Sequence, residues 1–215
     1  DSSGTPHISY RDYSNDDLKY AVKSGGSWSI ETVDSVVGVG KYSSIAVDSS
    51  GNPHISYSDE TNAELKYAVL SGGIWTFETV DSGGLVGYFS SLALDSSGNP
   101  HISHYSRSSG GGFNSTHDLT NAVKSDGIWT LEIIESAGNV GLRTFLVLDS
   151  SDNTHISYFT RGSSGDLRYI VSAPDEFVIP PFVYAVIIVI MLLVLYLFIR
   201  RRRNRSEDTS DLAVE

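Results

Sequence analysis

The sequence predicts an all-β fold made of β-propeller blades, each of four antiparallel strands, followed by one C-terminal transmembrane α-helix. Three observations predict this fold class. Copies of the decapeptide "DSSGNPHISY" begin at Asp1, Asp48, Asp95 and Asp149, at intervals of 47, 47 and 54 residues. Each interval contains short segments in which apolar and polar residues alternate, as they do in strands. Finally, the 23 residues 177–199 carry no charge and end at an arginine block.

The second repeat shows the blade pattern most clearly. Its apolar residues recur at every second position, and short glycine-containing turns, "SSGNP" and "SGGI", join the first strand to the second and the third to the fourth. The four expected strands cover residues 43–48, 54–59, 65–70 and 75–81. Extended to the other repeats, the pattern predicts blades at about residues 1–34, 35–81, 82–135 and 136–172.

The blade count predicts a partial propeller of three to four blades. The first blade lacks its first strand in this sequence, and the last blade lacks its fourth. Propellers close with about four to eight blades. We therefore expect further blades to complete the ring, either from an N-terminal part of a longer protein or from another chain.

The repeated decapeptide has a structural interpretation. Its aspartate caps the turn between the first two strands, its glycine accepts a positive φ, and its proline presets the exit from the turn. The histidine recurs once per blade, whereas a catalytic group is needed once per site. We therefore expect the histidines to be structural hydrogen-bonding residues, with ligand contact as the alternative. The residues in question are Asp48, Asp95, Asp149, His7, His54, His101 and His155.

Tryptophan also recurs, at Trp28, Trp75 and Trp129, each time after a glycine-containing turn between the third and fourth strands. This pattern resembles the Asp-box (BNR) repeats of sialidase-like propellers. Only "SDGIW", residues 125–129, keeps the aspartate of that motif. As a whole, the chain resembles prokaryotic surface proteins, archaeal ones among them, that are built of "PHISY" propeller repeats.

Composition excludes several classes of function. The chain has no cysteine, so it has neither disulfides nor a thiolate metal site. Its net charge of −11 argues against a nucleic-acid partner, because binding to phosphates needs basic side chains. No cofactor motif is present. Calcium is a minor alternative at Asp12, Ser14 and Asp16, which have the alternate spacing of a calcium loop but lack its glycine and distal glutamate.

The uncharged segment 177–199 would be about 35 Å long as a helix, enough to cross a hydrocarbon core of about 30 Å. Five arginines follow within residues 200–205, and the positive-inside rule places them in the cytoplasm. We therefore expect a single-pass cell-membrane protein with an extracellular propeller, a short linker at 173–176 and a cytoplasmic tail at 200–215, basic and then acidic. A buried core helix is the alternative. The segment also resembles archaeal C-terminal sorting signals, which would imply cleavage and replacement by a lipid, but we favour a retained anchor.

The loops between the second and third strands vary most among the repeats. The third of them carries the seven extra residues of the longest interval, between Tyr105 and Asp118. Variable loops on a repeated scaffold are the usual place for recognition. Asn114 begins an "NST" glycosylation sequon. The candidate ligand-binding residues are Arg107, Phe113, Asn114 and His117 in this loop, with Arg11 and Arg161 in the equivalent loops of other repeats.

Three functions are compatible with this arrangement. The favoured hypothesis is a surface binding or adhesion module for a glycan or protein ligand. A structural or assembly element of the cell surface is the second. A sialidase-like glycosidase is the third, and the three loop arginines are the feature in its favour. Such an enzyme also needs a tyrosine–glutamate nucleophile pair and an acid, and no such glutamate–tyrosine pair stands out in the sequence, so we do not expect an enzyme.

Overall fold

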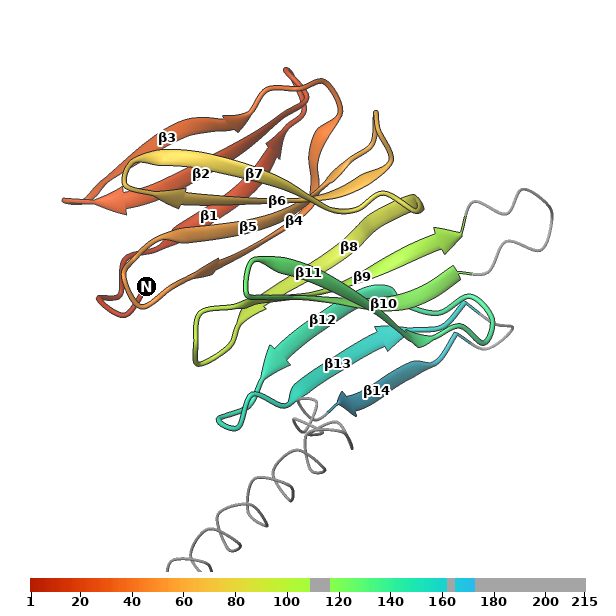
Figure 1. Cartoon of the computed structure of the whole chain (residues 1–215). Helices are drawn as coiled ribbons and strands as arrows, with labels where there is room; N and C mark the ends of the chain where they lie inside the picture. Colours follow the sequence, from red (N-terminus) through yellow and green to blue (C-terminus); the bar gives the residue numbers. More distant parts are fainter. Residues whose placement is uncertain (109–116, 162–164, 173–215) are drawn as a thin grey trace, which may run out of the picture. The chain divides into compact units, whose positions relative to one another are not determined.

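The computed structural model describes residues 1–108, 117–161 and 165–172 (Figure 1). This part of the chain is all-β, as predicted, and its strands lie close to the alternating segments of the sequence. The strands are β1 (His7–Asp12), β2 (Asp17–Ser24), β3 (Ser27–Asp34), β4 (Val39–Val47), β5 (Pro53–Asp59), β6 (Glu64–Ser71), β7 (Ile74–Asp81), β8 (Gly84–Leu94), β9 (Pro100–Ser108), β10 (His117–Ser125), β11 (Ile128–Glu135), β12 (Leu142–Leu148), β13 (Thr154–Phe159) and β14 (Leu167–Ser172).

The strands form four antiparallel sheets in which neighbours along the chain are neighbours in the sheet. The orders are β1-β2-β3, β4-β5-β6-β7, β8-β9-β10-β11 and β12-β13-β14. The first strands of successive sheets contact each other, β4 with β8 and β8 with β12. This succession of meander sheets can be followed along the colours of Figure 1. The predicted antiparallel sheets are therefore present, and their arrangement is propeller-like.

The decapeptide forms the tight turn that precedes β1, β5, β9 and β13. In the second repeat, Asp48 Oδ1 accepts the backbone N–H of Asn52 at 2.7 Å, and Asp48 Oδ2 accepts the side-chain amide of Asn52 at 2.8 Å. Gly51 supplies the required positive φ of 85°. Asp95 and Asp149 make the same bonds in their own turns.

Three of the repeated histidines connect this turn to the strand that pairs with their own, β2, β6 or β14. His54 is buried, its Nδ1 is hydrogen-bonded to the hydroxyl of Tyr67, and its Nε2 lies 3.6 Å from Asp48 Oδ2. Burial is the main cause that lowers the pKa of His54. The ring therefore stays neutral near pH 7. Equivalent histidine–tyrosine pairs are His7 with Tyr20 and His155 with Tyr169.

The third sheet departs from this pattern at one position. Asn121 stands where the other sheets have the tyrosine, and an asparagine is too short to reach the histidine ring. Accordingly, Nδ1 of His101 and Oδ1 of Asn121 are both buried without a hydrogen-bond partner. His101 Nε2 still lies 3.6 Å from Asp95 Oδ2.

Two of the repeated tryptophans join their sheet to the preceding one. Trp75 Nε1 donates to Glu31 Oε1 at 2.9 Å, and its ring lies edge-on to Tyr20 with centroids 5.6 Å apart. Trp129 Nε1 donates in the same way to Glu78 Oε2 at 2.7 Å. Each tryptophan thus covers the outer part of a sheet interface. Its indole N–H is hydrogen-bonded to a glutamate of the preceding sheet, as expected for a partly buried donor.

The apolar core is divided among the three interfaces between successive sheets. At each interface, side chains from the last two strands of one sheet pack against side chains from the first two strands of the next. Removal of these side chains from water contributes roughly 25 cal/mol per Å² of apolar surface. The fully buried members include Leu18, Val39, Ile55 and Tyr57 at the first interface, Leu65 and Ile102 at the second, and Leu119 at the third.

His104 is a fully buried titratable residue of the third sheet. It stands at the position of Tyr57 and is fully buried, with its Nε2 atom 3.6 Å from Asp81 Oδ2. Burial lowers the pKa of His104 to about 4, although the charge of Asp81 opposes this shift. The histidine is therefore neutral in the folded protein at pH 7.

This histidine should make the fold sensitive to acid. The unfolded chain takes up the proton near pH 6.5, whereas the folded chain takes it up only near pH 4, so stability is lost as the pH falls between these values. From pH 7 to pH 5 the expected loss is about 2 kcal/mol. Urea unfolding of wild type and His104→Tyr at both pH values measures it. The loss must be smaller in the variant, and an equal loss would contradict the assignment to His104.

The fourth sheet has an open outer edge within the described residues. Its last strand, β14, pairs only with β13, and it exposes Leu167 and Tyr169 by 66% and 63%. At the other end of the series, Trp28 has no preceding sheet in the described part of the chain and is 45% exposed. That further blades complete the ring stays a prediction.

The predicted anchor and its flanking segments, residues 173–176, 177–199 and 200–215, lie outside the described residues. Among the residues that are described, none forms a helix long and apolar enough to cross a membrane. The expected membrane location and orientation therefore stay predictions.

Candidate functional site

The sequence predicts recognition at the end of each sheet that holds the connections β1–β2, β5–β6, β9–β10 and β13–β14, which we call the loop end. In the first two sheets this end carries a compact ion-pair network. Arg11 pairs with Asp16 at 2.6 Å and with Glu60 at 3.3 Å, and Glu60 pairs with Lys41 at 2.7 Å. The hydrogen bond to Glu60 is the main cause that raises the pKa of Lys41. Arg11 is thus held by carboxylates of this network.

Aromatic side chains gather beside this network, at the loop end of the second and third sheets. The ring of Tyr42 lies 4.6 Å from that of Phe89 and 5.3 Å from that of Tyr88, between centroids. Tyr105 lies 6.4 Å from both Tyr88 and Phe89, and it stacks on His117 at 5.2 Å. We call these five residues the aromatic cluster. Their side chains are partly exposed, so the rings are available to a ligand.

The backbone of the cluster is strained at a repeated position. Tyr42 and Phe89 have φ values of 53° and 55°, and Arg143 has 51° at the equivalent position of β12. A positive φ in a bulky residue costs roughly 1–3 kcal/mol and persists only where the surrounding structure enforces it. Here it accompanies a break in pairing, because the register shifts between Lys41 and Ser44 and again in β8. The bulges turn these side chains out of the regular alternation.

Positive charge flanks the cluster on the side of the third and fourth sheets. Burial raises the pKa of Tyr105, and the charges of Arg107 and Arg161 oppose that shift. The pKa of His117 is lowered, first by burial and then by the charge of Arg107, with a further contribution from Arg161. The backbone N–H of Arg161 also donates to the carbonyl of Asn139, which pairs with His117 in a β-bridge. Arg107 and Arg161 therefore lie beside the same two rings.

The structure places the ligand residues predicted from the sequence in different surroundings. Arg107, His117 and Arg161 come together around Tyr105, whereas Arg11 belongs to the ion-pair network. Phe113 and Asn114 lie outside the described residues, so their predicted roles in binding and glycosylation stay predictions.

Sequence reasoning missed the aromatic residues of the cluster other than His117. A signal for them existed, because the repeats carry "GKY", "GYF" and "GLR" at the same offset, residues 40–42, 87–89 and 141–143. A large side chain at a fixed distance after a glycine, within an otherwise alternating strand, indicates a bulge.

The calcium alternative gains no support from the loop at residues 12–16. Asp12 accepts the backbone N–H of Ser14 and the side-chain amide of Asn15, both at 2.9 Å, and Asp16 is paired with Arg11. Across the described ranges, no group of three or more His, Cys, Asp or Glu side chains is arranged to hold a metal ion.

No protein-family model and no curated protein matches the sequence. Several solved structures share its fold at low identity, among them the following three. A protein of unknown function from Dyadobacter fermentans matches with a TM-score of 0.59 and 12% identity, over 81% of this chain and 52% of its own. A triple arginine-to-alanine mutant of AofleA from Arthrobotrys oligospora matches at 0.52 and 14%, over 78% of this chain and 49% of its own.

The third is a leech intramolecular trans-sialidase complexed with 2,7-anhydro-Neu5Ac, at a TM-score of 0.51 and 13% identity, over 79% of this chain and 29% of its own. At these identities the likeness shows the fold alone, and that fold is β-propeller-like. The chain spans about half the length of the first two proteins and less than a third of the trans-sialidase. The fold and the loop end together define a propeller-like protein with an aromatic and cationic surface.

Proposed function

We propose that the chain is the binding module of a cell-surface propeller and that it recognises a glycan at the aromatic cluster. The observation that carries this proposal is the contiguous set of partly exposed rings whose backbone is strained at Tyr42 and Phe89. Sugar rings present apolar C–H faces that pack on aromatic faces, and their hydroxyl groups accept hydrogen bonds from arginine. Arg107 and Arg161 are the candidate donors, because the charges of both side chains act on the pKa of Tyr105.

The other parts of the proposal rest on the sequence. Residues 177–199 would anchor the protein in the membrane, with the propeller outside and the C-terminus in the cytoplasm. The leech trans-sialidase shares the fold and was solved with a sugar bound, which makes a glycan the first ligand class to test. A shared fold alone does not establish a ligand, so glycan binding must be tested at the aromatic cluster itself.

We propose binding rather than hydrolysis. A glycosidase needs two carboxyl groups that flank the scissile bond, one of which donates a proton. Glu60, whose charge acts on Tyr88, is held by ion pairs with Arg11 and Lys41. Both oxygen atoms of this carboxylate are occupied by these two cations, so neither is free to approach a glycosidic bond.

The proposal is tested by a glycan array with the full chain, followed by calorimetry on the glycans that bind. Phe89→Ala should weaken binding about tenfold or more, equivalent to about 1.4 kcal/mol, because the variant removes a ring from the centre of the cluster. Alanine keeps the Cβ atom, so the strained backbone is not released. The matched control is Phe77→Ala, whose ring is 44% exposed on the outer strand β7. Equal affinity of the two variants would contradict the proposal.

A further inference from the structure

The last strand of each of the first three sheets ends in an acidic residue that faces the next sheet, and we call this residue the junction acid. At the first interface this junction acid is Asp34. Its Oδ2 accepts a hydrogen bond of 2.7 Å from the buried hydroxyl of Tyr57 and lies 3.9 Å from Lys66 Nζ. A hydroxyl and a cation thus compensate a buried carboxylate. At the third interface the junction acid is Glu135, which accepts hydrogen bonds from Tyr158 and Arg168.

The second interface lacks both compensating groups. Alignment of the repeats places His104 at the position of the tyrosine and Thr120 at the position of the lysine or arginine. His104 Nε2 stays 3.6 Å from Asp81 Oδ2, beyond hydrogen-bond distance, and Thr120 Oγ1 is hydrogen-bonded to Ser106 instead.

The orientation of the junction acid is nevertheless unchanged. Asp81 Oδ1 accepts the backbone N–H of Gly83 at 2.9 Å, as Asp34 Oδ1 accepts that of Val36 at 3.0 Å. The same turn therefore presents Oδ2 toward the next sheet at both interfaces. The two interfaces differ only in the side chains of the next sheet that face Oδ2.

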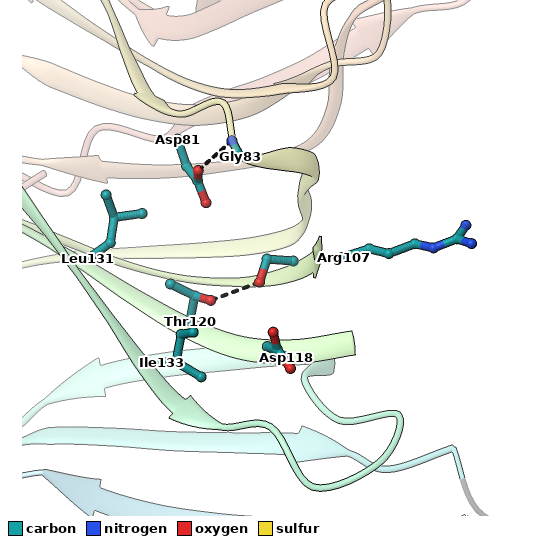
Figure 2. Close-up of a pocket in the computed structure, with 8 residues that line it drawn as sticks. Asp81, Gly83, Arg107, Asp118, Thr120, Leu131 and Ile133 are labelled. Atoms are coloured by element: carbon teal, nitrogen blue, oxygen red, sulfur yellow. Dashed lines mark hydrogen bonds between the residues drawn. The ribbon is translucent and has the colours of Figure 1, made fainter. Parts of the chain in front are cut away.

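A pocket of about 300 Å³ opens at this interface (Figure 2). Because Asp81 and Thr120 both line it, the pocket lies where the lysine side chain lies at the first interface. Arg107 does not fill the space, since its side chain is directed away from Asp81 in Figure 2. The lining residues are Asp81, Gly83, Ser106, Arg107, Asp118, Thr120, Leu131 and Ile133.

The remaining walls suit an aliphatic chain. Leu131 and Ile133 are 46% and 60% exposed, and Ile133 replaces the threonine found at this position in the first two sheets. The buried neighbour of Asp81 cannot supply the missing charge, because burial keeps His104 neutral at pH 7. Both of its ring nitrogens are buried without a hydrogen-bond partner. The site therefore combines three features. Asp81 lacks the cation found at the other interfaces, the buried His104 beside it has no hydrogen-bond partner, and Leu131 and Ile133 form an apolar wall.

We propose that this pocket binds a primary ammonium group carried on an aliphatic chain, with the ammonium on Asp81 where the other two interfaces place the chain's own cation. The methylene groups lie along Leu131 and Ile133. Two sources share this chemistry, a free aliphatic amine and a lysine side chain of a partner protein. The site differs from that of the glycan proposal, which concerns the aromatic cluster, although Arg107 borders both.

Calorimetry on the full chain tests the proposal with cadaverine as the amine and pentane-1,5-diol as its uncharged counterpart. Cadaverine should bind and the diol should not. Asp81→Asn should weaken cadaverine binding by about tenfold or more, because it removes the charge that the ammonium meets. The matched control is Glu132→Gln, which removes an exposed carboxylate of β11 and should leave binding unchanged. No binding of cadaverine at millimolar concentrations, or equal binding by wild type and Asp81→Asn, would overturn the proposal.

A second variant keeps the test decisive if Asp81→Asn does not fold. Thr120→Lys restores the side chain that occupies the equivalent space at the first interface, so it should abolish cadaverine binding and raise the thermal midpoint. Unchanged cadaverine binding and an unchanged midpoint in this variant would sink the idea. A lysine-containing peptide that binds more tightly than cadaverine would identify a partner's lysine as the source, whereas the reverse order would identify a free amine.

Discussion

Gly87→Ala is expected to lower the free energy of unfolding by about 3 kcal/mol or more. Gly87 has a φ of 79°, a conformation that a side chain makes costly. A Cβ atom added there would also lie 2.9 Å from the Cα of Leu65 and 3.1 Å from the carbonyl oxygen of Glu64. Both contacts are with backbone of β6, so relief would require the two sheets to separate. Urea unfolding of the full chain measures the loss.

Gly98→Ala is the matched control for this variant. Gly98 has a φ of 85°, but a Cβ atom added there would meet nothing within 4 Å. This control carries the conformational cost alone, about 1 kcal/mol. The difference between the two variants therefore reports the close approach of the sheets. Equal losses would mean that the contact with β6 is absent in solution.

The same glycine links the fold to the aromatic cluster. Gly40 in β4 and Gly141 just before β12 occupy the equivalent positions, and a Cβ atom added at either would lie 3.0 Å or less from a Cα atom of the preceding sheet. The glycines let the first strand of each sheet approach its neighbour, and the bulge that follows them holds Tyr42 and Phe89 at positive φ. The strained rings are thus a consequence of how closely the sheets pack.

The repeat predicted the sheets because strand alternation and turn chemistry are local properties of the sequence. Asp48 and Gly51 specify the same turn wherever the decapeptide occurs, and the alternation of Ile55 and Tyr57 specifies one face of a strand. These signals need no knowledge of neighbouring sheets. They were sufficient for the all-β class and for the antiparallel meander.

The candidate sites could not be predicted in the same way, because their residues meet across sheets. Tyr42 and Phe89 belong to different repeats, and only the packing of β4 against β8 brings their rings together. The exchange of tyrosine for His104 is visible in the sequence, but its meaning depends on Asp81, which lies 23 residues earlier and in another sheet. A repeat alignment shows which position differs, whereas the structure shows which group it has left without a partner.

Substitutions of Tyr57 are expected to show how much the hydrogen bond to the junction acid Asp34 contributes to the free energy of unfolding. Tyr57→Phe should lower the free energy of unfolding by about 2 kcal/mol, because it removes a hydrogen bond to a buried carboxylate and leaves Asp34 short of a donor. Tyr57→Ala should cost about 4 kcal/mol, because the side chain is fully buried and its loss also creates a cavity.

Urea unfolding separates the two contributions of this side chain. The matched control is Tyr13→Phe, whose ring is 78% exposed and whose hydroxyl makes no hydrogen bond within the described residues, so it should change stability by less than about 0.5 kcal/mol. If Tyr57→Phe were as mild as this control, Lys66 alone would suffice to hold Asp34. The hydroxyl would then add nothing that the lysine does not already supply, and of the two groups missing around Asp81 only the cation would matter.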